Sequence, residues 1–162
     1  MTITIRTATI DDSKLLAKLN MAVQQPHVDA LPDRFKPLKP DNPELSAFFE
    51  ARLSDDSTYT FIAEDDGEAI GYVHCVLQDI PDNVFVYGLR DFHIDQIAVL
   101  ESHQGQGVGN LLMEHAIKLG REFKADRISL GVVAFNKGAI RFYERLGFKI
   151  GSHRMTMKIS DG

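Results

Sequence analysis

The stretch Gln104-Gly105-Gln106-Gly107-Val108-Gly109 decides the fold. An apolar strand running to about Val99 leads into it, and an amphipathic helix beginning at Val108 leads out. Glycines at alternate positions leave the backbone N–H groups unshielded just where a helix begins. These amides and the positive end of the helix dipole face one point, so the stretch predicts a phosphate-binding loop. A flexible surface turn is the alternative.

The same residues exclude two other nucleotide-binding loops. A Walker A loop requires the pattern G-x-x-x-x-G-K-S/T, which this sequence does not contain. A dinucleotide fingerprint, G-x-G-x-x-G, fails because its last position is Asn110 when counted from Gly105 and Leu112 when counted from Gly107. The acidic residue that would bind a ribose after the next strand is also absent.

The composition is that of an ordinary globular chain, with 44% hydrophobic and 25% charged residues among 162. This length predicts one domain over residues 1–162. The net charge of −5 argues against nucleic-acid binding, which needs a basic face. No apolar run approaches the roughly 20 residues that span a bilayer, so no membrane partner is expected. The single cysteine, Cys75, cannot form an internal disulfide, and we expect a cytoplasmic protein in which it is a buried strand residue.

The predicted elements form one mixed α/β domain. Four prolines between positions 26 and 40 are expected to break any long helix, and the apolar residues among them predict an ordered cover rather than a linker. Asp66-Gly67 predicts a hairpin turn. Strands are expected at Ile3–Thr9, Tyr59–Ala63, Ala69–Leu77, Asp91–Val99, Arg127–Val133, Phe148–Ile150 and Met155–Ile159, and helices at Ser13–Val23, Pro43–Leu53, Val108–Leu119 and Lys137–Leu146.

A second string lies one helix and one strand beyond the glycine loop. It reads Asn136-Lys137-Gly138-Ala139-Ile140-Arg141-Phe142-Tyr143-Glu144-Arg145-Leu146-Gly147-Phe148. The loop itself fits the pattern Gln/Arg-x-x-Gly-x-Gly/Ala, through Gln104, Gly107 and Gly109, and follows the triplet Ile97-Ala98-Val99. Both motifs, in this order, resemble the GNAT superfamily of N-acetyltransferases over about residues 90–150.

The resemblance implies a fold and a donor. The fold is a mixed, mostly antiparallel sheet of about six or seven strands with a V-shaped split between two parallel strands, flanked by about four helices. The donor is acetyl-coenzyme A, a co-substrate, and no metal ion is implied. Its pantetheine arm would pair like an added strand with Ile97, Ala98 and Val99. Its pyrophosphate would lie on the amides of Gln104, Gly105, Gln106, Gly107, Val108, Gly109 and Asn110.

Two residues of the second string match functional positions of the family. Asn136 looks like the side chain that hydrogen-bonds the cofactor near its pantetheine or phosphate end, and its alternative role is the N-cap of the following helix. Tyr143 matches the tyrosine whose hydroxyl faces the thioester sulfur, where a phenol can donate a proton to the leaving thiolate. Its alternative role is a core aromatic beside Phe142.

The catalytic base is expected on the strand Asp91–Val99. Asp95 matches the position where many relatives carry a carboxylate, and its reference pKa of about 3.9 implies relay through water. It shares a strand face with Ile97 and Val99 unless a bulge intervenes, so its orientation stays open. His93, with a reference pKa of about 6.5, is the alternative base, and a third alternative is that neither residue is the base. His74 is expected to be structural.

The acceptor is less defined than the donor. The loop lacks the Arg or Lys common in the family, so charge compensation would come from Lys137 or Arg141. The resemblance implies an N-acetyltransferase acting on a primary amine of a small molecule or peptide, with a non-catalytic acyl-coenzyme A sensor as the alternative and a homodimer as a further expectation. The implied acceptor walls are Gln25–Pro40, Asp79–Tyr87 and Gly151–Met155, with Asp29, Asp33, Asp79 and Asp82 to hold an amine and Phe35, Phe85 and Tyr87 to shape a pocket.

Overall fold

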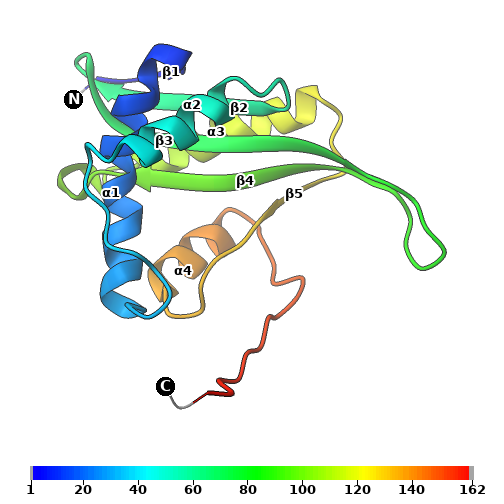
Figure 1. The fold of residues 1–162 in the computed structure, drawn as a ribbon. Helices are drawn as coiled ribbons and strands as arrows, with labels where there is room; N and C mark the ends of the chain where they lie inside the picture. Colours follow the sequence, from blue (N-terminus) through cyan, green and yellow to red (C-terminus); the bar gives the residue numbers. More distant parts are fainter. Residues whose placement is uncertain (1, 161–162) are drawn as a thin grey trace. The chain divides into compact units, whose positions relative to one another are not determined.

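The structure, a computed structural model, describes residues 2–160 and has two compact units, one ending at Gly131 and one beginning at Val132. Figure 1 shows their helices and strands. Because the units are described separately, the prediction of one domain over the whole chain stays a prediction. Among the described residues, no helix combines the length and the apolar character that crossing a bilayer would require.

The first unit is built on one sheet with strand order β1-β2-β3-β4-β5. Neighbouring strands run antiparallel except for β4 and β5, which are parallel and joined by a helical crossover. The mixed, mostly antiparallel prediction is therefore confirmed. The strands are β1 Ile3–Thr7, β2 Thr58–Asp65, β3 Glu68–Ile80, β4 Leu89–Val99 and β5 Arg127–Leu130.

The β2–β3 hairpin follows directly from its turn residues. Asp66 and Gly67 both have positive φ, 51° and 84°, which is the backbone of a tight two-residue turn. Glycine adopts this conformation without steric cost, and aspartate is among the few other residues that tolerate it. The predicted hairpin is confirmed.

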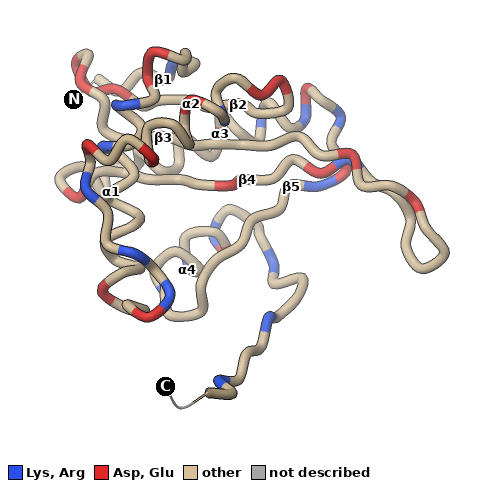
Figure 2. Tube along the Cα trace, in the orientation of Figure 1, with Lys and Arg blue, Asp and Glu red and all other residues tan. Residues whose placement is uncertain are grey.

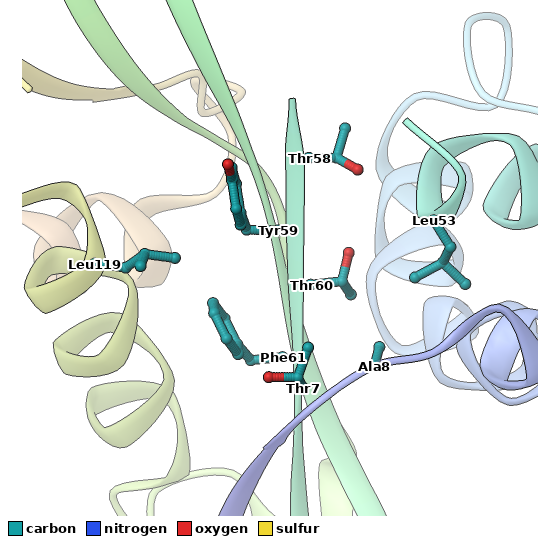
Figure 3. Close-up of a pocket in the computed structure, with 8 residues that line it drawn as sticks. All are labelled: Thr7, Ala8, Leu53, Thr58, Tyr59, Thr60, Phe61 and Leu119. Atoms are coloured by element: carbon teal, nitrogen blue, oxygen red, sulfur yellow. The ribbon is translucent and has the colours of Figure 1, made fainter. Parts of the chain in front are cut away.

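Three α-helices of the first unit cover the two faces of the sheet. They are α1 Ser13–Ala30, α2 Pro43–Leu53 and α3 Val108–Glu122, with short 3-10 turns η1 Ile10–Asp12 and η2 Glu101–His103. Figure 3 shows the two faces along β2, with Tyr59 and Phe61 directed to Leu119 of α3 and Thr60 directed to the side of Leu53 of α2. The core beneath α1 and α2 contains Leu16, Ala17, Leu19, Phe49, Ile62, Tyr72 and Ala98.

Helix α3 lies close to the sheet at one position because of a glycine. A Cβ atom on Gly120 would come within 3.3 Å of the side chains of Phe92 and Ile128. The ring centroids of Phe61 and His115 are 4.4 Å apart on the same face. The close approach at Gly120 packs the crossover helix against both parallel strands, and the Phe61–His115 contact packs it against β2.

The prediction that the first helix ends at Val23 is wrong. Helix α1 continues to Ala30 with Pro26 inside it, although proline cannot donate the backbone hydrogen bond of that turn. The following segment packs back on the extension, since Gln24 Nε2 donates to the Lys36 carbonyl at 2.7 Å and the rings of His27 and Phe35 lie 4.8 Å apart. Tertiary contacts thus outweigh the proline, and the segment is packed against α1 rather than being a free linker.

The second unit contains α4, Lys137–Arg145, and no strand within its described residues. Gly147 follows the helix with φ 102°, as expected for a C-terminal cap. The strands predicted at Phe148–Ile150 and Met155–Ile159 are wrong, so the sheet has five strands in place of six or seven. Met155 and Ile159 are more than four-fifths exposed, and without a pairing partner their alternating pattern forms no ladder.

Candidate active site

The glycine loop presents a row of free backbone donors. None of the amides from Gly105 to Asn110 donates a hydrogen bond to any residue that the structure describes. Gly105 and Gly107 have positive φ, 76° and 85°, and a Cβ atom at either would meet nothing within 4 Å. The row ends in the first turn of α3, where the helix dipole is positive. These residues fit a pyrophosphate by the rule that helix N-termini bind phosphate.

The loop side chains brace this backbone and include no lysine or arginine. Gln104 Nε2 donates to the Val99 carbonyl at 2.9 Å, and Gln106 Nε2 donates to the Ser102 carbonyl at 3.1 Å. His103 Nε2 lies 3.2 Å from a carboxylate oxygen of Asp65. Lys and Arg are absent between Leu100 and Asn110, as the loop between β4 and α3 shows in Figure 2. Phosphate binding would therefore depend on the backbone.

Strands β4 and β5 pair over four residues of each, and then the pairing stops. Asp91–Ile94 pairs with Arg127–Leu130, whereas β4 continues to Val99 with a register partner only on β3. The predicted split between two parallel strands is thus present as an unpaired β4 edge. Ile97, Ala98 and Val99, the residues expected to pair with pantetheine, all lie on it.

A bulge in β4 settles the orientation of Asp95. His74 of β3 pairs with Gln96 and Cys75 pairs with Ile94, so Asp95 is the extra residue between them. Asp95 and Gln96, although adjacent, both reach the face covered by α1 and α2. Asp95 contacts Arg52 of α2, and Gln96 contacts Asn20 of α1. Strict alternation predicts that Asp95 shares a face with Ile97 and Val99. Because of the bulge, it does not.

The contact between Asp95 and Arg52 is an open ion pair. Arg52 Nη1 lies 3.7 Å from Asp95 Oδ2, and the two side chains are 37% and 28% exposed. Asp95 accepts no hydrogen bond from a described residue, and the Arg52 guanidinium donates none. The guanidinium carbon instead lies 4.8 Å from the ring centroid of Phe48. Both charged groups therefore keep free capacity for a ligand.

A neutral network borders this pair. The Tyr72 hydroxyl donates to Gln96 Oε1 at 2.7 Å, and Asn20 Nδ2 donates to the Tyr72 oxygen at 3.0 Å. Burial raises the pKa of Tyr72, with the Asp95 charge acting in the same direction. The phenol therefore stays protonated, and it acts here as a fixed dipole rather than as an acid.

His93, the alternative base, belongs to a closed network between β4 and β5. Its Nδ1 lies 2.8 Å from the Ser129 hydroxyl, which donates to Asp91 Oδ2 at 2.7 Å. Arg127 Nε donates to the other Asp91 oxygen at 2.9 Å. The hydrogen bonds of this network hold the two parallel strands together and engage one of the two ring nitrogens of His93, so His93 stays the alternative base.

His74 and Cys75 are both buried on β3. His74 Nδ1 lies 2.5 Å from the Thr60 hydroxyl, and burial lowers the pKa of this histidine, so it is neutral at neutral pH. Its Nε2 has no hydrogen-bond partner among the described residues. Burial raises the pKa of the Cys75 thiol to about 12, which leaves it protonated and unreactive.

A small pocket lies elsewhere, where β1 ends beside β2. Its lining includes Ala8, Leu53, Thr58 and Phe61, and Figure 3 shows these side chains on both sides of β2. Strand β3 separates β2 from β4 in the sheet. The pocket therefore lies away from the unpaired β4 edge and contains none of the predicted site residues.

Asn136 and Tyr143 lie in the second unit. Asn136 caps α4, because its side-chain oxygen accepts from the Ala139 amide at 3.1 Å. The Tyr143 hydroxyl makes no hydrogen bond with a described residue, and its ring lies 5.9 Å from that of Phe148. Burial raises the pKa of Tyr143. A phenol with a raised pKa stays protonated and can donate.

Several residues predicted to hold the acceptor are engaged elsewhere. Asp79 pairs with Arg90 at 2.8 Å, and Asp82 accepts from the Gly88 amide at 2.9 Å. Phe85 and Tyr87 are both 90% exposed on the β3–β4 hairpin and form no pocket there. Arg52 was not among the predicted site residues, since no motif contains it and only the fold brings α2 to β4.

Comparisons with known proteins agree with this geometry. Residues 25–148 match the model of the acetyltransferase (GNAT) family. The chain belongs to the acetyltransferase (GNAT) family. It is an acyltransferase of the N-acetyltransferase type, as the predicted resemblance implied.

Similar proteins and solved structures match this chain over nine-tenths of its length or more. An N-alpha-acetyltransferase of Sulfurisphaera tokodaii is 29% identical over 90% of this chain and 79% of its own. The structure of a tetramutant of the BH1408 protein of Bacillus halodurans superimposes with a TM-score of 0.90 at 27% identity, covering 96% of this chain and 99% of its own. An aminoglycoside N-acetyltransferase in complex with CoA shares the fold, with a TM-score of 0.74 at 20% identity over 99% of this chain and 96% of its own.

Proposed function

We propose that this acetyltransferase moves the acetyl group of acetyl-coenzyme A to a primary amine by direct attack. One continuous segment carries the proposal. It begins with the Asp95 carboxylate, continues along the unpaired edge of β4 at Ile97–Val99, and ends in the free amides of the glycine loop. A base, a strand edge for a peptide-like arm and a phosphate cradle thus follow one another in the order that the donor would need.

The reaction requires two proton transfers. An alkylammonium must lose a proton before its nitrogen can attack, and Asp95 would take that proton through a water because its carboxylate is a weak base. The amine nitrogen then bonds to the thioester carbon, and the carbon–sulfur bond breaks as the tetrahedral intermediate collapses. Tyr143 would donate its hydroxyl proton to the leaving thiolate. Its raised pKa supports this role, because the proton is retained until the thiolate forms.

The relatives favour an α-amine as the acceptor. The Sulfurisphaera tokodaii protein is an N-alpha-acetyltransferase, and it matches this chain over nine-tenths of its length. We therefore propose the α-amine of a peptide or an amino acid as the acceptor class to test first. Asn136, already the cap of α4, would contact the pantetheine or phosphate end of the donor.

A thiol-release assay tests the proposal. Acetyl-coenzyme A is presented with a panel of amines that includes peptides, amino acids, a polyamine and an aminoglycoside. We expect release with at least one α-amine, and Tyr143→Phe should lower kcat about 100-fold while the KM for acetyl-coenzyme A stays within about twofold. Donor binding by calorimetry with no release for any amine would instead indicate the acyl-coenzyme A sensor. Unchanged kcat in Tyr143→Phe would remove Tyr143 as the acid.

A further inference from the structure

The ion pair between Arg52 and Asp95 is incomplete as a structural contact. A buried or structural pair normally spends its hydrogen-bonding capacity within the protein, as Arg127 does on Asp91. Arg52 and Asp95 approach only to 3.7 Å, remain partly exposed, and make no hydrogen bond to each other. Two opposite charges with free capacity therefore lie side by side at the start of the unpaired β4 edge.

Apart from Asp95, the groups around Arg52 do not neutralise its positive charge. Asp55 is a second carboxylate whose charge interacts with Arg52, and it is occupied with Ser57, accepting from its amide at 2.9 Å and its hydroxyl at 2.7 Å. His74 is neutral because burial lowers its pKa. The neighbouring polar groups of Tyr72 and Gln96 are uncharged and bonded to each other.

Such a pair discriminates between amines by their net charge. A plain ammonium attracted to Asp95 would also lie beside Arg52, which repels it. An acceptor that carries a carboxylate a few bonds from its amine would place its negative charge on Arg52 and its positive charge on Asp95. Alternating charges around such a group of four attract each other at every neighbouring position.

We propose that Arg52 is a specificity-determining residue that selects acceptors with a carboxylate close to the reacting amine. This inference rests on the proposed function, in which Asp95 receives the ammonium. Two sources share this chemistry, a free amino acid and a polypeptide whose first residues include Asp or Glu. The guanidinium, held over the Phe48 ring, is positioned to meet the carboxylate without contributing to the proton transfers.

Matched acceptors test the selection. One arm compares alanine with alaninamide, and the other compares peptides that begin Ala-Glu, Ala-Gln and Ala-Lys, all with acetyl-coenzyme A and the full chain. We expect kcat/KM to be about tenfold higher for the carboxylate-bearing member of at least one arm, and lowest for Ala-Lys. The responding arm identifies the source of the carboxylate.

Variants of Arg52 separate selection from folding. Arg52→Gln should abolish the preference, through a raised KM for the acidic acceptor and a raised kcat/KM for Ala-Lys. Arg52→Lys keeps the charge and should retain most of the preference. Arg121→Gln, which changes an exposed arginine in the last turn of α3, is the matched control and should behave as the unmodified chain does.

Three outcomes overturn the inference. Equal kcat/KM for acidic, neutral and basic acceptors would show that Arg52 does not select. An equal loss for all acceptors in Arg52→Gln, with an unchanged melting temperature, would make Arg52 part of the general machinery. Thiol release with none of these acceptors, nor with the wider amine panel, would instead overturn the proposed function itself.

Discussion

Asp91 and Asp95 lie on the same strand, yet they have opposite surroundings. Asp91 is 2% exposed and accepts hydrogen bonds from Arg127 and Ser129, both on β5. Asp95 lies just beyond Ile94, the last residue of β4 that pairs with β5, accepts no hydrogen bond from a described residue, and faces an arginine at 3.7 Å. One carboxylate holds two strands together, whereas the other is left available where those strands stop pairing.

The difference shows how one strand can serve stability and chemistry at once. A buried carboxylate is tolerated when hydrogen bonds satisfy it, and Arg127 and Ser129 donate them to Asp91. A group that must exchange protons with a substrate needs the reverse, namely capacity that the protein has not used. The end of the β4–β5 pairing separates these two situations on a single strand.

The largest expected effect comes from Asp95→Asn. The amide cannot accept the ammonium proton, so kcat should fall about 100-fold, within the range that general-base catalysis contributes. The melting temperature should change by less than about 2 °C, because a partly exposed ion pair contributes little to stability. Thiol release and thermal unfolding measure the two quantities on the same preparation. A large loss of stability would show that Asp95, like Asp91, is a structural carboxylate, which would contradict the difference drawn between the two.

The complementary change is Asp91→Asn. It leaves an amide N–H₂ facing donors on β5, so the free energy of unfolding should fall by about 2 kcal/mol. The value is kept modest because the Arg127 side chain is 52% exposed. Denaturant unfolding measures this change, and kcat well below the melting temperature should stay within about threefold. A loss of kcat as large as that of Asp95→Asn, with unchanged stability, would contradict the assignment.

Much of the difference between Asp91 and Asp95 could not be predicted from the sequence. The glycine loop and the Asp66-Gly67 turn are local features, and local chemistry was enough to predict them. The orientation of Asp95 depends on a bulge, and the bulge exists only because β4 pairs with β3. The alternation of side chains along one strand therefore could not predict which face Asp95 lies on. Arg52 is far from Asp95 in sequence and belongs to no motif.

The two failures in the secondary structure have the same origin. Pro26 was expected to break α1, but contacts made by residues 34–36 support the helix beyond it. The C-terminal strands were predicted from alternation alone, and alternation specifies a strand only where a partner supplies the ladder. In both places the secondary structure is determined by contacts between residues distant in sequence, and a local sequence pattern carries no information about such contacts.

The smallest expected effect concerns Asp12, a third carboxylate and a second example of the closed type. Arg6 donates to both of its oxygens at 2.9 Å, and the Thr9 amide donates to one at 2.7 Å. The hydrogen bonds from Arg6, the largest cause, lower the pKa of Asp12. A lowered folded-state pKa stabilises the protein above the unfolded-state pKa, about 3.9, and this contribution is lost as the pH falls below it.

Asp12→Asn should therefore cost about 1 kcal/mol of unfolding free energy at pH 7 and progressively less as the pH falls toward 3. Denaturant unfolding of both proteins between pH 7 and pH 3 measures the convergence of their stabilities. Asp95→Asn should cost less unfolding free energy at pH 7 than Asp12→Asn, because no described residue donates a hydrogen bond to its carboxylate. If the two variants lost the same stability, the carboxylate of Asp95 would be engaged in stabilising the fold, and it would not be available for the acceptor amine.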